Sequence, residues 1–185
     1  MKVIKSKLPG VLTIEPNVFG DDRGYFMESW QSVRYKDAGI EPAFVQSNVS
    51  KSEQGVLRGL HFQNPNPQGK LVYVLEGEVF DVAVDIRVGS PTFGQHESII
   101  LSDQNHKQFY VPEGFAHGFC VLSKSATFCY MCTNYYDANA EASLLWNDND
   151  LGIDWPLSSP KLSDKDFKAL KLKDIDKSKL PVFDL

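Results

Sequence analysis

The chain has 185 residues, of which 42% are hydrophobic and 23% are charged, and its formal net charge is −5 at pH 7. No apolar run approaches the roughly 20 residues of a membrane-spanning helix, and the negative charge argues against a nucleic-acid surface. We therefore expect a soluble protein with one buried core and neither membrane nor nucleic-acid partners. The N-terminal stretch lacks the apolar segment of an export signal, so we expect a cytoplasmic protein.

The first third of the chain contains few helical signals. The segment DDRGYF places Arg23 in a turn, and SVRYKDAG predicts two helical turns over 32–39 with Gly39 just past the helix end. FVQSNVS reads as a strand with Gln46 and Asn48 on one face, where both amides can donate and accept hydrogen bonds.

Residues 70–86, KLVYVLEGEVFDVAVDI, contain two β-branched runs separated by a Glu-Gly turn. Alternation divides the second run between two faces. One face takes Phe80, Val82, Val84 and Ile86, and the other takes Val79, Asp81, Ala83 and Asp85.

Four further strands are predicted at 96–101, 108–112, 117–123 and 126–136, with turn signals between them. Many short strands at this spacing indicate an antiparallel sandwich, jelly roll or small barrel whose mouth can hold a small ligand. The tail from about residue 163 is more polar, and SDKDFKALK predicts a helix capped by Ser163 or Asp164. We expect residues 1–185 to form a single domain with a polar, helical C-terminal appendage.

The three cysteines and four histidines favour no metal or redox site. Cys120, Cys129 and Cys132 lie in apolar surroundings, and in a strand the sulfurs of CYMC would point to opposite faces, which indicates reduced core thiols. The histidines lie in separate segments without acidic or thiolate partners at metal-ligand spacing, so no metal is expected. An isolated His61 is more often a hydrogen-bonded core residue than a catalytic base.

Two cations near His61 favour a binding site over the interpretation of His61 as a core residue. Arg58 and Lys70 flank an apolar strand, where their side chains either reach solvent or bind an anion. Arg58 and His61 have opposite strand parity, so a shared site requires a bulge, for which Gly59 is the evident place. Tyr130 and Tyr136 share strand parity, and spacing leaves open whether they are core residues or one of them transfers a proton.

Several motifs follow one another over nearly the whole chain: DDRGYFMESW, FVQSNVSKSEQGVLRGLHFQ, QGKLVYVLEGEVFDVAVDIR, VPEGFAHGF, TNYYDANAE and LGIDWP followed by LSDKD. In this order and spacing they resemble the dTDP-4-dehydrorhamnose 3,5-epimerase family. The resemblance implies a mainly β, cupin-like double-stranded β-helix or jelly-roll barrel with a few short helices. It also implies a metal-free and cofactor-free isomerase of dTDP-rhamnose biosynthesis, a homodimer whose nucleotide site is completed by the second subunit.

The resemblance also assigns roles to residues. His61 matches the family's general base, Tyr130 its proton donor, and Asp166 the carboxylate that orients the histidine. Lys70 matches the cation near the keto oxygen of the sugar. The remaining matched positions contact nucleotide, diphosphate or sugar: Arg23, Glu28, Gln46, Asn48, Arg58, His117, Glu141 and Lys165. Tyr136 lies about 20 Å from Tyr130 along an ideal strand, so we expect it to be a pocket wall.

These residue types suit epimerisation beside a ketone. The protons on C3 and C5 of dTDP-4-dehydro-6-deoxy-D-glucose are acidic, so removal from one face and return to the other gives dTDP-4-dehydro-L-rhamnose without redox chemistry. Histidine titrates near neutral pH, tyrosine can return a proton from the opposite face, and a lysine stabilises the enolate. The alternatives are a C3-only epimerase, a deoxysugar ketoisomerase, a non-catalytic sugar-nucleotide barrel and a metal-dependent cupin oxygenase.

Overall fold

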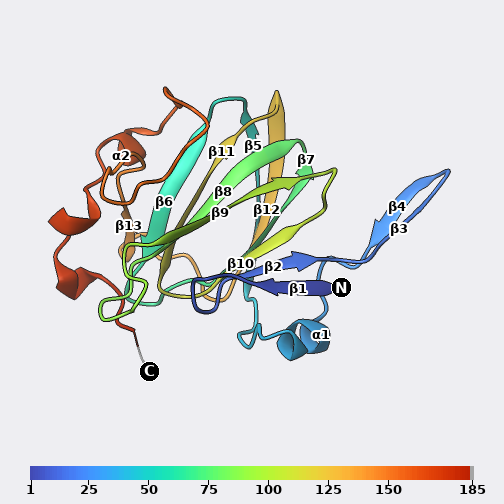
Figure 1. Ribbon diagram of the computed structural model, residues 1–185, viewed down its shortest axis with the longest axis horizontal. Helices are drawn as coiled ribbons and strands as arrows, with labels where there is room; N and C mark the ends of the chain where they lie inside the picture. The colour runs from blue at the N-terminus through green and yellow to red at the C-terminus, as the bar shows by residue number, and fades with distance from the viewer. Residues whose placement is uncertain (184–185) are drawn as a thin grey trace.

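The computed structural model, which describes residues 1–183, is built on two antiparallel β-sheets that face each other (Figure 1). The larger sheet has the strand order β1-β2-β10-β7-β12-β5, and the smaller one has the order β13-β6-β11-β8-β9. The mainly β architecture expected from the sequence is confirmed.

The strands of the larger sheet are β1 (Lys2–Lys5), β2 (Leu12–Glu15), β5 (Gln46–Glu53), β7 (Lys70–Glu76), β10 (Gln108–Val111) and β12 (Ser125–Cys132). Those of the smaller sheet are β6 (Leu57–Gln63), β8 (Glu78–Asp85), β9 (His96–Ser102), β11 (Phe115–Val121) and β13 (Glu141–Ser143). A separate hairpin consists of β3 (Val18–Asp21) and β4 (Gly24–Met27), and it projects away from both sheets (Figure 1).

Two short α-helices lie outside the sheets. Helix α1 (Ser32–Asp37) ends as predicted, with Gly39 in the left-handed region at φ +99°. Helix α2 (Asp164–Phe167) is capped by Ser163, whose hydroxyl accepts a hydrogen bond from the backbone N–H of Asp166. Two 3-10 turns, η1 (Leu172–Asp174) and η2 (Lys177–Lys179), follow it.

Alternation along β8 fills two separate cores. Val79 and Ala83 pack between the sheets, while Val82 and Val84 pack on the outer face of the smaller sheet. The C-terminal segment covers that outer face, and its contribution to the second core comprises Leu151, Leu172 and Leu180. Both faces of β8 are therefore buried, and its two buried carboxylates each have a partner, His117 for Asp81 and Arg87 for Asp85.

The Glu-Gly turn does not make a hairpin, because β7 and β8 belong to different sheets. β7 pairs with β10 and β12, whereas β8 pairs with β9 and β11. Gly77, at φ +85°, lets the chain cross from one sheet to the other while its backbone N–H donates to Asp103. Because the chain passes from one sheet to the other at Gly77, the two sheets are joined at this end and enclose a space between them.

The strand predicted over 126–136 is too long. β12 ends at Cys132, and residues 133–136 turn away from the sheet. Thr133 still pairs with Gly69 through its backbone N–H and its hydroxyl, but Tyr136 donates its backbone N–H to the side chain of Gln46 instead of a strand. The segment TNYY carries no glycine or proline, and its one turn-forming residue, Asn134, was a weaker signal than the aromatic residues around it.

Candidate active site

A cavity opens between the two sheets and consists of two connected chambers. The outer chamber has a volume of about 400 Å³ and the inner chamber about 190 Å³, and His61, Lys70 and Tyr130 line both. The outer chamber is also lined by Gln46, Asn48, Phe62, Gln63, Gln68, Tyr136, Glu141 and Lys165. The inner chamber is completed by Ser50, Arg58, His117, Phe119 and Phe128.

His61 points into the cavity from β6 and is held from behind by Asp166. The imidazole Nε2 lies 2.5 Å from Oδ1 of Asp166, a side chain only 3% exposed. The Ser163 hydroxyl donates to the other carboxylate oxygen at 2.9 Å, so both oxygens are held. Burial alone would raise the pKa of Asp166, but the hydrogen bond and charge of His61, with Ser163 and Lys165, outweigh burial and lower it.

An ionised Asp166 fixes the tautomer of His61. A carboxylate only accepts hydrogen bonds, so Nε2 carries the proton and Nδ1 keeps its lone pair. The imidazole is therefore prepared to accept a proton at Nδ1, and the carboxylate stabilises the cation that results.

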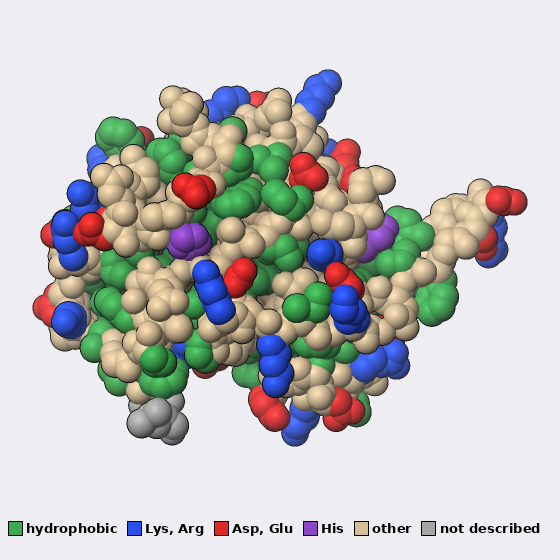
Figure 2. All heavy atoms as spheres, in the orientation of Figure 1, with side chains coloured by type: hydrophobic (Ala, Val, Ile, Leu, Met, Phe, Trp, Pro, Cys, Tyr) green, Lys and Arg blue, Asp and Glu red, His purple; other side chains and the backbone are tan. Residues whose placement is uncertain are grey.

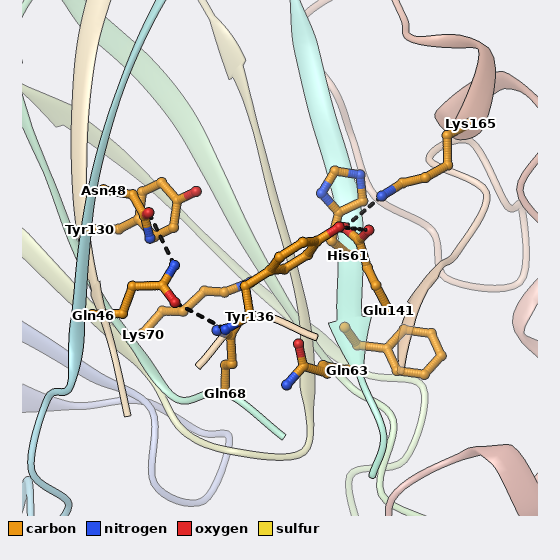
Figure 3. A pocket seen from close by; sticks show the side chains of 11 residues that line it. Gln46, Asn48, His61, Gln63, Gln68, Lys70, Tyr130, Tyr136, Glu141 and Lys165 are labelled. Atoms are coloured by element: carbon orange, nitrogen blue, oxygen red, sulfur yellow. Dashed lines mark hydrogen bonds and ion pairs between the residues drawn. The ribbon is translucent and has the colours of Figure 1, made fainter. Parts of the chain in front are cut away.

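Tyr130 lies on the opposite wall of the cavity from His61. It projects from β12, and in Figure 3 its hydroxyl points across the cavity toward the imidazole. Burial is the largest cause that raises the pKa of the phenol; Cys132 and Glu141 act in the same direction, and Arg58 opposes them. Tyr130 consequently remains protonated at neutral pH, as a proton donor must.

Lys70 and Arg58 bring two cations into the inner chamber without carboxylate partners. Within residues 1–183 neither forms an ion pair, and no acidic side chain lines this chamber. Burial lowers the pKa of Lys70, although Cys132, Glu141 and Asp81 act in the opposite direction. Lys70 is half-buried and Arg58 is exposed, and both line the same chamber without a carboxylate to neutralise them. Two unneutralised cations at one chamber favour a ligand that is or becomes negative.

A bulge in β6 allows Arg58 and His61 to share the inner chamber. Arg58 pairs with Phe119 and His61 pairs with His117, so Gly59 and Leu60 together face one residue of β11. The extra residue reverses the parity of the strand and turns both side chains to the same face. The irregularity predicted at Gly59 is confirmed.

His117 forms a second histidine–carboxylate pair, which sequence analysis had not identified. It lies beside His61 on the neighbouring strand, and its Nε2 is 2.9 and 3.0 Å from the two oxygens of Asp81. Asp81 is fully buried. The available signal was its place in the inward row of β8, between Val79 and Ala83, where a carboxylate requires a partner.

The outer chamber carries a linked polar wall. The Tyr136 hydroxyl donates to Glu141 at 2.9 Å, and Lys165 pairs with the other oxygen of Glu141 at 2.5 Å (Figure 3). Burial opposes ionisation of Glu141, but the bonds from Lys165 and Tyr136 lower its pKa. Tyr130 and Tyr136 reach the same cavity because the chain turns after β12.

Two amides that the sequence analysis passed over organise the turn after β12. Gln63 donates to the carbonyls of Asn66 and Tyr135 and accepts from the backbone N–H of Asp137. Gln68 donates to the carbonyl of Asn134 at 2.8 Å. These bonds hold the segment that carries Tyr136 against the cavity mouth.

Arg23 and Glu28 lie outside the cavity of their own chain. Arg23 is at the tip of the β3–β4 hairpin, 89% exposed, and pairs with Asp21. Glu28 pairs with Arg34 of α1 at 3.3 Å. The structure thus brings together the other predicted site residues, but not these two.

Residues 1–183 contain neither a cluster of metal-ligating side chains nor a membrane-spanning helix. No group of three or more His, Cys, Asp or Glu side chains there could hold a metal ion. None of the helices in this part of the chain is long and apolar enough to cross a membrane. The three cysteines are unpaired and buried, as predicted.

Comparison with known proteins identifies the family. The protein-family model described as dTDP-4-dehydrorhamnose 3,5-epimerase matches residues 5–174. The chain belongs to the dTDP-4-dehydrorhamnose 3,5-epimerase family. The enzyme of that name from Shigella flexneri is 53% identical over 178 residues, which cover 95% of this chain and 98% of that enzyme.

Solved structures agree with this assignment to the epimerase family. The dTDP-6-deoxy-D-glucose-3,5-epimerase of Legionella pneumophila, in complex with dTDP-4-keto-L-rhamnose, is 52% identical. It superposes with a TM-score of 0.97 over 100% of this chain and 99% of that one. A 3′-monoepimerase of Streptomyces bikiniensis, in complex with dTDP-quinovose, is 33% identical with a TM-score of 0.89, covering 96% and 91%. The two-sheet barrel is therefore the expected cupin-like fold.

Proposed function

We propose that the chain epimerises C3 and C5 of dTDP-4-dehydro-6-deoxy-D-glucose, giving dTDP-4-dehydro-L-rhamnose. The observation that carries this proposal is the placement of His61 and Tyr130 on opposite walls of one cavity, with Lys70 lining both chambers. A base on one face of a sugar ring and an acid on the other are what inversion at carbon requires.

The reaction proceeds by proton transfer through an enolate. Nδ1 of His61 removes the proton from C3 or C5, and the electron pair of the C–H bond moves to the C4 oxygen as the carbonyl opens. The ammonium of Lys70 stabilises this oxygen, because it lies in a chamber without competing carboxylates. The Tyr130 hydroxyl then protonates the carbon from the opposite face, and the carbonyl reforms.

The two catalytic groups must be reset after each inversion. The step leaves an imidazolium at His61 and a phenolate at Tyr130, and return of one proton from the former to the latter restores both. The carboxylate of Asp166 stabilises the imidazolium during this interval. Only protons move, so the balance calls for no redox cofactor.

The rest of the cavity provides a place for the nucleotide. We assign the sugar to the inner chamber, with Arg58 and His117, and the nucleotide diphosphate to the outer chamber, with Lys165 as its cation. Tyr136 offers an aromatic wall, and Gln46 and Asn48 offer amides at the mouth. Glu141, bonded to both Tyr136 and Lys165, fixes this wall.

Label from deuterated water tests the reaction directly. With the 4-keto sugar nucleotide as substrate, we expect deuterium at both C3 and C5 of the product. Label at C3 alone would make the chain a C3-only epimerase, the activity named for the Streptomyces bikiniensis neighbour. No label at either carbon would make it a binding barrel.

Paired histidine variants locate the base. His61→Asn should abolish exchange at both carbons while the sugar nucleotide still binds. His96→Gln serves as the control, because His96 lies on the edge strand β9 and bonds the carbonyl of Leu151, away from the cavity. An equal loss of deuterium exchange in His61→Asn and His96→Gln would contradict the assignment of His61 as the base.

We also propose that the chain acts as a homodimer in the cytoplasm. The β3–β4 hairpin exposes Phe19 and Phe26, 64% and 71% accessible, although an isolated two-stranded hairpin is marginally stable in water. Figure 2 shows this apolar surface along the projection, with charged side chains at its tip. A second copy would cover it and receive Arg23 at its nucleotide site. The buried thiols suit a reducing compartment.

A mixing experiment tests the shared site. Arg23→Ala and His61→Asn homodimers should each be impaired, because every site lacks one residue. After the two proteins are mixed and allowed to exchange subunits, a heterodimer has one site with both residues, and activity should reappear. Failure to regain activity, with exchange shown by mass spectrometry of tagged chains, would contradict the shared site.

A further inference from the structure

The inward row of β5 continues past the two predicted amides. Gln46, Asn48, Ser50 and Ser52 follow at every second position, opposite Cys132, Tyr130, Phe128 and Ala126 of β12. The first three line the cavity, whereas Ser52 lies beyond its lining and is buried. A buried hydroxyl behind a polar cavity is expected to have a partner.

That partner is the guanidinium of Arg58. Nε of Arg58 donates to Oγ of Ser52 at 3.0 Å, and no other hydrogen bond of this guanidinium exists among residues 1–183. The guanidinium is planar, so holding Nε fixes the direction of the two terminal nitrogens. These nitrogens remain free to meet a ligand, and Arg58 lines the inner chamber.

The partner of Arg58 is a neutral serine, whereas the partner of Arg87 is a carboxylate. Arg87 is held by both oxygens of Asp85, at 2.9 and 2.7 Å, which fixes its guanidinium and also neutralises it. Ser52 is neutral, so it orients Arg58 and leaves its positive charge uncompensated. Arg58 itself is exposed, but its bond to the buried Ser52 fixes its guanidinium at the chamber wall. A cation that is fixed and unneutralised there stabilises charge that appears only during a reaction.

We propose that Ser52 is a positioning residue, which aims the guanidinium of Arg58 at the negative charge developing on the sugar. This rests on the proposed function, because the charge is that of the enolate. Lys70, lining the same chamber, and Arg58 then act on the intermediate together. Arg58 consequently contributes to turnover more than to ground-state binding.

Steady-state kinetics of Ser52→Ala test the role. We expect kcat to fall about tenfold, the worth of one hydrogen bond to a charged group, while KM stays within about twofold. Ser52→Thr keeps the hydroxyl and should restore most of kcat. An unchanged kcat, or a rise in KM alone, would overturn the proposal.

A double-mutant cycle shows whether Ser52 acts through Arg58. In an Arg58→Met background, Ser52→Ala should change the remaining rate of deuterium exchange by less than about twofold. A further tenfold loss there would mean that Ser52 acts elsewhere. Ser102→Ala is the control, because it also removes a buried hydroxyl that accepts a hydrogen bond, here from the backbone N–H of Asn105, and it lies outside the cavity lining.

The contact itself can be measured without turnover. In the wild-type protein labelled with 15N-arginine, the Nε–H signal of Arg58 should resist solvent exchange, and Ser52→Ala should remove this protection. Unprotected exchange in the wild-type protein would overturn the proposal whether or not the enzyme is active. Absence of deuterium incorporation by the wild type would instead count against the proposed function.

Discussion

At the scale of single residues, the cavity owes its reactivity to groups that do not face the substrate. Asp166 lies behind His61, and Asp81 lies behind His117, each buried and each bonded to an Nε2. Burying a carboxylate is unfavourable by itself, so these pairs exist because the histidine compensates the charge. In return, each imidazole has a fixed ring orientation and one defined free nitrogen.

Replacing Asp166 by Asn should lower kcat by about 10²- to 10⁴-fold, because the amide cannot stabilise the imidazolium. KM for the sugar nucleotide should change little, since Asp166 does not line the cavity. Initial rates over a range of substrate concentrations separate the two parameters. A rise in KM at constant kcat would show that Asp166 shapes binding instead.

The same variant should alter the pH dependence of stability. The pKa of Asp166 is lowered in the folded protein from its ordinary value of 3.8, so its charge stabilises the fold above that value. This contribution is lost as the pH falls through the folded pKa. The free energy of unfolding should therefore decline more steeply in acid for the wild type than for Asp166→Asn, as measured by urea denaturation.

Tyr130→Phe should separate proton removal from proton return. His61 remains intact, so deuterium exchange at C3 and C5 should continue, with the label returned to its original face. Formation of the inverted product should fall by about 10²- to 10³-fold, the usual worth of a general acid. Proton NMR of the products in deuterated water distinguishes exchange with retention from inversion, and full inversion by Tyr130→Phe would remove the phenol from the mechanism.

At the scale of elements, the bulge in β6 decides whether the site exists. Gly59 has a φ of +130°, and a Cβ there would meet Cα of Gly118 at 2.5 Å and the carbonyl oxygen of His117 at 2.9 Å. Only glycine allows the two strands to approach this closely while β6 takes its extra residue. Arg58 and His61 depend on that residue for their common direction.

Gly59→Ala should lower the free energy of unfolding by about 3 kcal/mol or more, since it combines backbone strain with contact against a neighbouring strand. Gly55→Ala is the matched control. Gly55 also has a positive φ, +83°, but its Cβ would meet nothing within 4 Å. Gly55→Ala should lower the free energy of unfolding by only the backbone strain, about 1–2 kcal/mol. Equal losses in denaturant unfolding would show that the close approach is unimportant.

Sequence patterns predicted those elements whose constraints are local. The alternation of side chains predicted the two faces of β8, and Gly39 predicted the end of α1. Both predictions are possible because side-chain direction and backbone φ depend on neighbouring residues. The end of β12 and the partner of Asp81 could not be predicted, since both depend on contacts between distant segments. Within the site, His61 and Asp166 are 105 residues apart, and only the family resemblance linked them.

At the scale of the whole molecule, the exposed apolar surface is not confined to the hairpin. Val49 of β5 and Leu75 of β7 are 64% and 44% exposed. Val49 lies across from Cys129 on the outer face of the larger sheet, and segment 28–45 covers only part of that sheet through its contribution to a third core. Apolar surface of this kind is typical of an interface between subunits.

Val49→Asp should convert the proposed dimer to a monomer, because a charge buried in an apolar interface lacks a partner. Activity should fall with it, since Arg23 would no longer reach a second site. Val182→Asp is the control, as Val182 is also exposed but lies on the C-terminal segment. Sedimentation velocity reports the mass, and a dimeric Val49→Asp protein would place the interface elsewhere.

We propose that the chain forms one domain, in which the C-terminal segment and the two sheets belong to the same structural unit. This segment buries Leu172 and Leu180 against the smaller sheet and pairs Leu170 with Leu144. Thermal unfolding should accordingly follow one cooperative transition by both circular dichroism and tryptophan fluorescence.

Helix α2 brings Asp166 to His61 from the last tenth or so of the chain. A chain cut before α2 would lose the carboxylate that polarises His61 together with Leu172 and Leu180, which cover the outer face of the smaller sheet. Truncation there would therefore remove the catalytic partner and part of the core in a single step.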